Sequence, residues 1–171
     1  MKLTFLNDSP KELIFQQVAD YLVEQNLKID KQDDSRPWGG FFVIEENEAE
    51  KFINLYFPNL SKSELNISGK LSPKILIVAP DKRLSWQYHH RRAEIWKLIG
   101  GTAGVVISDT DEEKEIRHLI TGDIIHLKQG ERHRLLGLKG WGIIAEIWRH
   151  TDAEHPSDEE DIVRVQDDFG R

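Results

Sequence analysis

The chain has 171 residues, which is typical of one domain or of one domain with an arm. Its 23 Lys and Arg against 30 Asp and Glu give a net charge of −7, which argues against a nucleic-acid binder, because such proteins normally carry a basic excess. The lack of cysteine excludes disulfides, thiolate zinc sites and cysteine nucleophiles. No apolar run approaches the ~18 residues of a membrane span, so we expect a cytoplasmic protein with neither nucleic acid nor membrane as a partner.

Residues 1–35 are predicted to form an N-terminal helical arm. Ser9 is placed to cap a helix, Pro10 suits the first helical position and Glu12 completes a capping box. The apolar residues that follow recur at helical spacing and form one face: Leu13, Ile14, Val18, Tyr21 and Leu22. The helix is expected to end near Asn26, and its apolar face must pack on the main body or on a second subunit.

Residues 36–171 change to short apolar segments separated by turn residues, a pattern that indicates a β-sandwich or barrel. The candidate strands are Gly40–Glu45, Lys51–Phe57, Lys74–Ala79, Leu84–His89, Ala93–Ile99, Gly104–Ser108, Ile116–Ile120, Asp123–Leu127, His133–Leu138 and Gly142–Trp148. The pairs Gly100-Gly101 and Lys139-Gly140 are among the predicted turns, and the polar segment 59–73 is expected to leave the barrel.

The acidity of the chain lies mostly in a C-terminal tail, residues 151–171, which holds eight acidic side chains and two arginines. The rest of the chain is therefore close to neutral. Within it, the segments 81–94 and 128–139 are locally basic, with four basic residues each against two and one acidic residues. An acidic protein of this kind can still offer a cationic pocket to a phosphorylated ligand.

The side chains with the clearest chemical signal lie in these two basic segments. Gln87 and His89 are two residues apart, so on a strand they project from the same face, and Glu94 follows across a short turn. His133 opens a later strand. An amide oxygen, two imidazoles and a carboxylate make an N/O site for a divalent transition metal, and without thiolates such a site keeps positions open for water or substrate.

The same residues resemble the cupin superfamily. Its first motif has a His-x-His pair, a Glu after four further residues and a Gly seven positions on, and this chain has Gln87-x-His89, Glu94 and Gly101. Its second motif is matched by Gly122, by Lys128-Gln129-Gly130 with Lys in place of Pro, and by His133. Together with Arg36-Pro37-Trp38-Gly39 and Asp161-Ile162-Val163-Arg164, these motifs resemble the type II mannose-6-phosphate isomerase cupin, a domain that also forms the C-terminal part of bifunctional mannose-1-phosphate guanylyltransferases.

The resemblance implies a mainly β cupin fold over residues 36–171, a double-stranded β-helix or jelly-roll-like barrel, with the N-terminal α-helix outside it. It implies one divalent metal ion (Zn, or Mn, Co, Ni or Fe) held by Gln87, His89, Glu94 and His133. The implied activity is the isomerisation of mannose 6-phosphate to fructose 6-phosphate through an enediol(ate). Lys74 and Arg164 are expected to face the phosphorylated sugar, with Arg164 in a catalytic role, and a homodimer is expected because cupins often pair.

Other candidates for substrate contact are basic or aromatic. Arg91, Arg92 and Arg132 flank the two metal-bearing segments, where guanidinium groups suit phosphate, although a solvated surface is the alternative. Trp148 replaces a residue that is usually Gln in the family and is expected to line the pocket. Glu146 has two alternatives: it points outward, or it points into the barrel, where a raised pKa suits a general acid or base.

Two further classes of function stay open at the level of sequence. Arg91 and Ile95 stand where the family usually has His, and with Trp148 this altered rim fits a non-catalytic sugar- or sugar-phosphate-binding cupin. Two imidazoles and a carboxylate also bind iron(II), as in metal-dependent oxygenases. Gln87 and the Asp-Ile-Val-Arg motif at 161–164 argue against the oxygenase.

Overall fold

The computed structural model describes Leu3 and residues 7–171. Its helices are α1 (Lys11–Glu24), α2 (Ala49–Tyr56) and α3 (Lys62–Leu65), with a 3-10 turn η1 (Glu46–Glu48). Its strands are β1 (Ile29–Asp33), β2 (Gly39–Ile44), β3 (Lys74–Val78), β4 (Trp86–Tyr88), β5 (Arg92–Ser108), β6 (Arg117–Leu119), β7 (Ile124–Leu127), β8 (Arg132–His150) and β9 (Val163–Gln166). Within the described part, no helix is long and apolar enough to cross a membrane.

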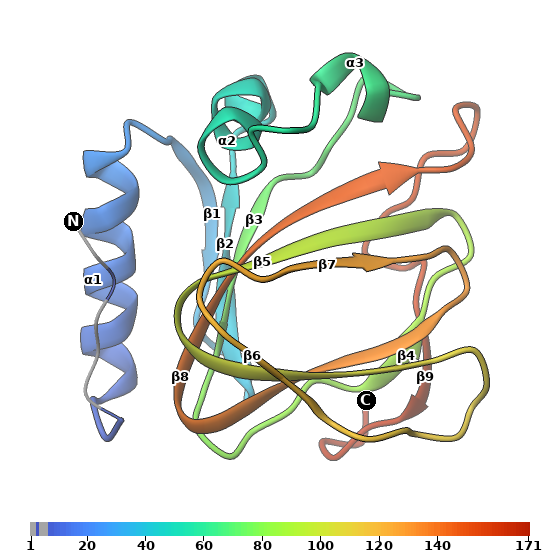
Figure 1. Cartoon of the computed structure of the whole chain (residues 1–171). Coiled ribbons are helices and arrows are strands. Elements are labelled where there is room, and N and C mark those ends of the chain that lie inside the picture. Colours follow the sequence, from blue (N-terminus) through green and yellow to red (C-terminus); the bar gives the residue numbers. More distant parts are fainter. Residues whose placement is uncertain (1–2, 4–6) are drawn as a thin grey trace.

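The strands form one antiparallel sheet that curls into the jelly-roll-like barrel expected of a cupin (Figure 1). Along one path the order is β1-β2-β3-β8-β4-β9, while β5 pairs with β6, β7 and β8. Two long strands, β5 and β8, pair over most of their length and bend to join the two halves of the barrel. The mainly β cupin fold with an N-terminal helix is therefore confirmed.

Two of the predicted turns are wrong, because β5 and β8 continue through them. Gly100-Gly101 lies inside β5 and pairs with β8, and the register shifts on either side of the two glycines, where the strand bends. Gly101 has a φ of 70°, and a Cβ there would lie 1.8 Å from the Trp141 carbonyl oxygen, so only glycine fits. Lys139-Gly140 likewise lies within β8.

The predicted strand at Lys51–Phe57 is also wrong, because this segment is helix α2. Its buried residues are Ala49, Phe52, Ile53 and Tyr56, which is the spacing of one helical face rather than strand alternation. Conversely, β1 falls in a polar stretch with no strand signal. It is an edge strand of the sheet and forms by pairing with β2. The segment 59–73 leaves the sheet as expected and carries α3.

Helix α1 packs on the outer face of the barrel, as predicted. Its buried residues are Ile14, Phe15, Val18, Tyr21 and Leu22. The predicted face is correct except that Leu13 is 45% exposed and Phe15 takes its place, with its ring 5.5 Å from that of Phe42. The predicted capping box is wrong, because Pro10 is the N-cap and no side chain caps the helix.

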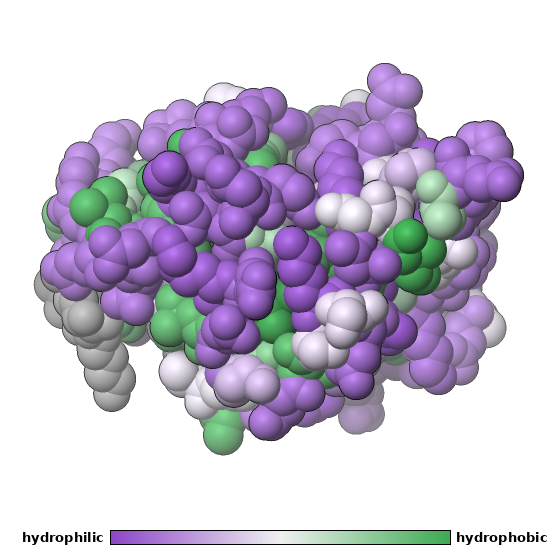
Figure 2. Space-filling model, turned by 90° about the horizontal axis from the view of Figure 1, so that it is seen from above, coloured by the Kyte–Doolittle hydropathy of each residue, from purple (hydrophilic) through white to green (hydrophobic). Residues whose placement is uncertain are grey.

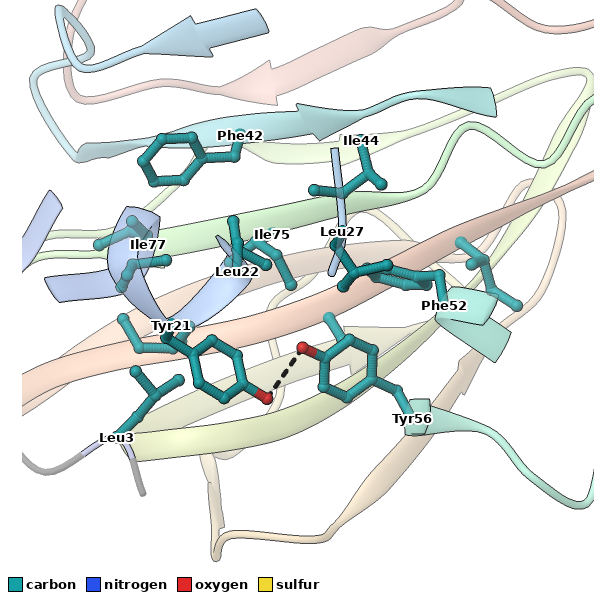
Figure 3. Packing of buried hydrophobic residues seen from close by; sticks show 14 of the residues in the cluster. Leu3, Tyr21, Leu22, Leu27, Phe42, Ile44, Phe52, Tyr56, Ile75 and Ile77 are labelled. Atoms are coloured by element: carbon teal, nitrogen blue, oxygen red, sulfur yellow. Dashed lines mark hydrogen bonds between the residues drawn. The ribbon is translucent and has the colours of Figure 1, made fainter. Parts of the chain in front are cut away.

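The core below α1 joins the N-terminal helix to the barrel. One apolar cluster contains residues of α1, α2, β2, β3 and β8. Figure 3 shows Leu22, Phe42 and Ile75 from three of these elements in one layer, with a hydrogen bond between the hydroxyls of Tyr21 and Tyr56. Helix α1 belongs to this core, and β1 belongs to the sheet, so both elements pack together with the barrel. The division of the chain into two parts at residue 35 stays a prediction. Seen from above, the surface is mostly hydrophilic with scattered apolar patches (Figure 2).

Candidate metal centre and substrate cavity

A cavity of about 340 Å³ opens on the inner face of the sheet. Side chains from β2, β3, β4, β5, β8 and β9 line it, so residues far apart in the sequence converge there. The buried part of the lining includes Trp38, Lys74, Arg92, Glu94 and Glu146. The C-terminal tail closes one side through Glu159 and Ile162.

Three of the four predicted metal ligands meet beside this cavity, and one of them, Glu94, lines it. His89, Glu94 and His133 are each at most 2% exposed, and each offers a ligand atom within 4.8 Å of the other two. The Nε2 atom of His89 lies 3.1 Å from Glu94 Oε1, and that of His133 lies 3.4 Å from Glu94 Oε2. This N/N/O group has the donor types that a divalent transition metal requires.

The backbone fixes both imidazoles with Nε2 facing the cluster. His89 Nδ1 lies 2.6 Å from the Asp161 carbonyl oxygen, and His133 Nδ1 lies 3.0 Å from that of Glu131. An Nδ1–H that donates to a carbonyl leaves the lone pair on Nε2, which is the orientation seen in ligating histidines. His133 Nε2 and Glu94 Oε2 are buried without a hydrogen-bond partner, so the three side chains fit a cation between them.

The fourth predicted ligand, Gln87, lines the cavity beside these three. It pairs with His133 across β4 and β8, and its amide nitrogen lies 3.5 Å from His89 Nε2. Its amide oxygen accepts a hydrogen bond of 2.6 Å from the Ser85 hydroxyl. Gln87 as a ligand stays a prediction, while its position next to the cluster agrees with that role.

Arg92 supports the cluster instead of lying at the surface. Its guanidinium donates to Glu94 Oε1 at 2.8 Å and to the Ser157 hydroxyl at 2.9 Å, and it stacks 3.6 Å from the Trp148 ring centroid. Burial raises the pKa of Glu94, but its electrostatic interactions with His89 and with the Arg92 guanidinium outweigh burial and hold that pKa well below its usual range. Glu94 is therefore an anionic carboxylate, the form that binds a metal.

Glu146 points into the cavity, which decides between its two alternatives. Its Oε2 accepts a hydrogen bond of 2.7 Å from the Trp96 indole, and its Oε1 accepts one of 3.1 Å from the Trp148 indole. Burial, followed by the nearby charge of Glu94, raises the pKa of Glu146 to about 7. A carboxyl group that titrates near neutrality can both accept and donate a proton in a reaction.

Lys74 lies across the strand pair from Glu146 and is buried in the cavity wall. It forms an ion pair with Glu159 of the C-terminal tail, and its Nζ lies 4.2 Å from the Trp148 ring centroid. Lys74 and Trp148 are thus in the cavity, as expected. Their roles in substrate binding stay predictions.

The remaining predicted arginines divide between the cavity and the outside. Arg164 lines the cavity and is the direct partner of Gln87 across β4 and β9. Arg91 lies 3.6 Å from Asp158, and Arg132 donates to Asp111 at 2.7 Å, and neither is among the residues that line the cavity. The structure does not bring Arg91 and Arg132 to the candidate site, so it gives no support to their predicted contact with substrate.

The C-terminal tail contributes residues that the sequence did not single out for this role. The Asp161 carboxylate accepts hydrogen bonds from the backbone amides of His90 and Arg91 and from the Ser157 hydroxyl. Partial burial opposes its ionisation, but these bonds lower the pKa of Asp161 to about 2. Since the Asp161 carbonyl also holds His89, this part of the acidic tail is a support for the candidate metal centre.

A jelly-roll barrel with an inward His-Glu-His cluster defines a cupin with a candidate metal centre. The family model described as "Mannose-6-phosphate isomerase C-terminal" matches residues 45–167, and the chain belongs to this family. The resemblance inferred from the motifs is therefore confirmed.

Curated relatives are enzymes and proteins of polysaccharide biosynthesis. The xanthan biosynthesis protein XanB of Xanthomonas campestris pv. campestris is 30% identical over 125 residues, which cover 73% of this chain and 25% of XanB. The mannose-1-phosphate guanylyltransferase ManC of Salmonella typhimurium is 28% identical, over 80% of this chain and 22% of ManC. The chain thus spans about a quarter of the length of these relatives.

Solved structures share the fold at low sequence identity. The crystal structures of the DMSP lyases RdDddP and RnDddQII include a match with a TM-score of 0.53 and 16% identity, over 90% of this chain and 70% of that one. Vicilin from Corylus avellana matches with a TM-score of 0.52 and 17% identity, over 81% of this chain and 36% of that one. At these identities the likeness concerns the fold alone.

Proposed function

We propose that the chain is a metal-dependent sugar-phosphate isomerase that interconverts mannose 6-phosphate and fructose 6-phosphate. One observation carries the proposal: Glu146, with a pKa of about 7, lines the same cavity as the candidate metal ligands Gln87 and Glu94. An aldose–ketose isomerisation needs one group that moves a proton between C1 and C2, and a second that stabilises the negative charge on the adjacent oxygens. The cavity offers residues for both.

The candidate ligands are suited to hold the charge-stabilising group. Gln87, His89, Glu94 and His133 would hold a divalent cation such as Zn, Mn, Co, Ni or Fe, which would supply the positive charge that polarises the sugar oxygens. The backbone carbonyls that hold both imidazoles, together with Arg92 on Glu94, keep these side chains oriented before any ligand arrives. Such preorganisation is the main contribution that a protein makes to this kind of site.

Glu146 is the candidate for proton transfer. As a carboxylate it takes the proton from C2 of the aldose, and as a carboxylic acid it returns the proton to C1. The hydroxyl proton passes from O2 to O1 in the same conversion, so no proton is gained or lost overall. Hydrogen bonds from the indoles of Trp96 and Trp148 fix both carboxyl oxygens in place. Its pKa of about 7 keeps both protonation states populated near neutral pH.

A non-catalytic sugar-phosphate-binding cupin is the second candidate, and Trp148 favours it. The family usually has Gln at this position, whereas here an indole stacks on Arg92 and lies beside Lys74. A bulky ring in the cavity wall reduces the room for a substrate to move between its open-chain forms.

A coupled isomerase assay on metal-reconstituted protein tests the proposal. We expect metal-dependent conversion of mannose 6-phosphate that is lost in Glu146→Gln and kept in His118→Gln, a matched change at an exposed residue on β6. Binding of mannose 6-phosphate by the wild type without turnover would instead support the binding module. Oxygen uptake by an iron-loaded sample would support an oxygenase.

A further inference from the structure

Four basic side chains surround the mouth of the cavity: Lys31, Arg36, Arg164 and Arg171. We call them the mouth cluster. They are exposed or half-buried, whereas the candidate metal ligands at the inner end are buried. The cavity therefore has an open cationic end and a buried end lined by Glu94 of the His-Glu-His group.

The cations of the inner cavity are already committed to protein partners. Lys74 is paired with Glu159, and Arg92 is paired with Glu94 and bonded to Ser157. Both residues are at most 6% exposed. A phosphate group that bound Arg92 would have to displace the buried Glu94 carboxylate, which is costly, and one that bound Lys74 would have to displace Glu159, whose side chain is 70% exposed.

The mouth cluster is different, because two of its members have no partner. Among the described residues, the side chains of Lys31 and Arg164 form no hydrogen bond or ion pair. Arg36 forms an ion pair with Asp33, and Arg171 forms one with Asp167. Burial and the like charges of Arg171 and then Arg36 lower the pKa of Arg164, in spite of Asp167. The cations repel one another, so an anion placed among them is stabilised.

Three chain segments build the mouth cluster. Lys31 lies on β1, Arg36 lies before β2, and Arg164 lies on β9 with Arg171 at the C-terminal end. Lys31, Arg36 and Arg171 fall outside residues 45–167, the part that the family model matches. On β9, Arg164 is the direct partner of Gln87, which places the cluster next to the candidate metal centre.

We propose that the mouth cluster is the site for the phosphate group of the substrate. The sugar carbons then extend inward to the candidate metal ligands and Glu146. Guanidinium forks match the oxygens of phosphate, and Lys31 adds a point charge. The cluster selects phosphorylated over free sugars. This assignment rests on the proposed function for the sugar, while the binding of a phosphate group by itself does not.

The test compares Lys31→Gln, Arg171→Gln and the double variant with Lys139→Gln, which removes a 90% exposed lysine away from the cavity. Lys31 has no partner to lose, so its variant is not expected to disturb the fold. Titration calorimetry with inorganic phosphate is expected to show roughly tenfold weaker binding for each single variant, the effect of one charge-assisted hydrogen bond. The double variant loses more, and Lys139→Gln binds like the wild type.

Steady-state kinetics with mannose 6-phosphate provides the second readout. KM is expected to rise in the mouth-cluster variants with little change in kcat, because their contact is the same in the bound substrate and the transition state. Unchanged phosphate affinity and KM in the double variant would overturn the mouth-cluster site and leave the isomerase intact. Phosphate binding that follows the cluster, in a protein without turnover, would overturn the isomerase and leave this site standing.

Discussion

The two faces of the same strands have opposite chemistry. On the outer face of β2, β3 and β8, the buried side chains that form the core are apolar, as with Phe42, Ile75 and Ala145. One residue along each strand, the inner face carries Lys74 and Glu146 among apolar neighbours such as Phe41. Strand alternation thus separates a face that packs from a face that binds.

The difference lies in what covers each face. Helices α1 and α2 seal the outer face, so an uncompensated polar group there would be costly, and its one side-chain hydrogen bond in Figure 3 joins Tyr21 and Tyr56. The inner face keeps charged groups in a cavity, where Glu94, Arg92 and Glu146 are stabilised by one another and by indoles. The apolar outer face stabilises the fold, whereas the inner face buries charged groups that lower stability but are available for binding and catalysis.

The largest expected effect breaks the outer face. Phe42→Ala removes a fully buried ring that packs on Phe15, and we expect a loss of about 3–5 kcal/mol in the free energy of unfolding. Chemical denaturation measures it, with Leu13→Ala, at a 45% exposed position on α1, as the control that costs little. An equal loss in both variants would contradict the assignment of the packed face.

The next effect is a pH dependence that belongs to the inner face. The pKa of Glu146 is about 7 in the folded protein against an ordinary value of 4.5, so between these pH values the folded state keeps a proton that the unfolded state releases. This contribution to stability is complete below pH 4.5 and is lost as pH rises through 7, by up to about 3 kcal/mol.

Glu146→Gln removes this titration. Unfolding measured with a chelator present at pH 5 and pH 8 is expected to show a smaller difference in the variant than in the wild type. Phe42→Ala is the control, because this change on the outer face is expected to lower stability equally at both pH values. A pH dependence that Glu146→Gln leaves intact would assign it to another group.

A smaller energetic effect concerns metal affinity alone. His133→Ala removes one of the two imidazoles of the cluster, and we expect a loss of at least ~100-fold in the affinity for a divalent cation, or about 2.7 kcal/mol. Competition with a metal-sensitive dye measures it. His118→Ala, at an exposed site, keeps the wild-type affinity, and a similar loss in both variants would place the metal elsewhere.

The smallest effect tests a hydrogen-bonded pair between the two helices that cover the outer face, α1 and α2. Tyr56→Phe removes the hydroxyl that bonds to Tyr21 and leaves one buried partner unsatisfied, so stability is expected to fall by about 1 kcal/mol. Removing both hydroxyls, in Tyr21→Phe with Tyr56→Phe, restores part of that loss. A double variant that loses the full sum of two separate costs would show that the pair is not coupled.

Strand alternation and turn residues predicted most of the barrel. They failed where the local composition favours one structure and pairing with a distant strand imposes another. Gly100-Gly101 has the composition of a turn, but pairing with β8 keeps it within β5, between two shifts of register. The segment 51–57 is too short and apolar for its period to be decided by composition. Strand β1 is polar because it is at the edge, so only its pairing with β2 reveals it.

The candidate metal centre could be predicted from motif spacing, whereas its surroundings could not. Alternation along β5 places Arg92 on the same face as Glu94, and Arg91, just before the strand, falls on the other face, so strand parity is the sequence signal for the position of Arg92. Asp161 and Lys31 come to the site from opposite ends of the chain. Their positions depend on how the tail and β1 join the barrel, which no local pattern contains.

In the proposed reaction, Glu146 moves a proton between C1 and C2 of a sugar phosphate beside the candidate metal centre. NMR of mannose 6-phosphate in D₂O with metal-reconstituted protein can follow this transfer, because the proton that Glu146 removes from carbon can exchange with solvent before it returns. We predict metal-dependent deuterium incorporation at C2 of the aldose and C1 of the ketose, which is lost in Glu146→Gln. Binding of mannose 6-phosphate to the metal-loaded wild type, with no deuterium exchange and no ketose formed, would overturn proton transfer by Glu146 and the isomerase function.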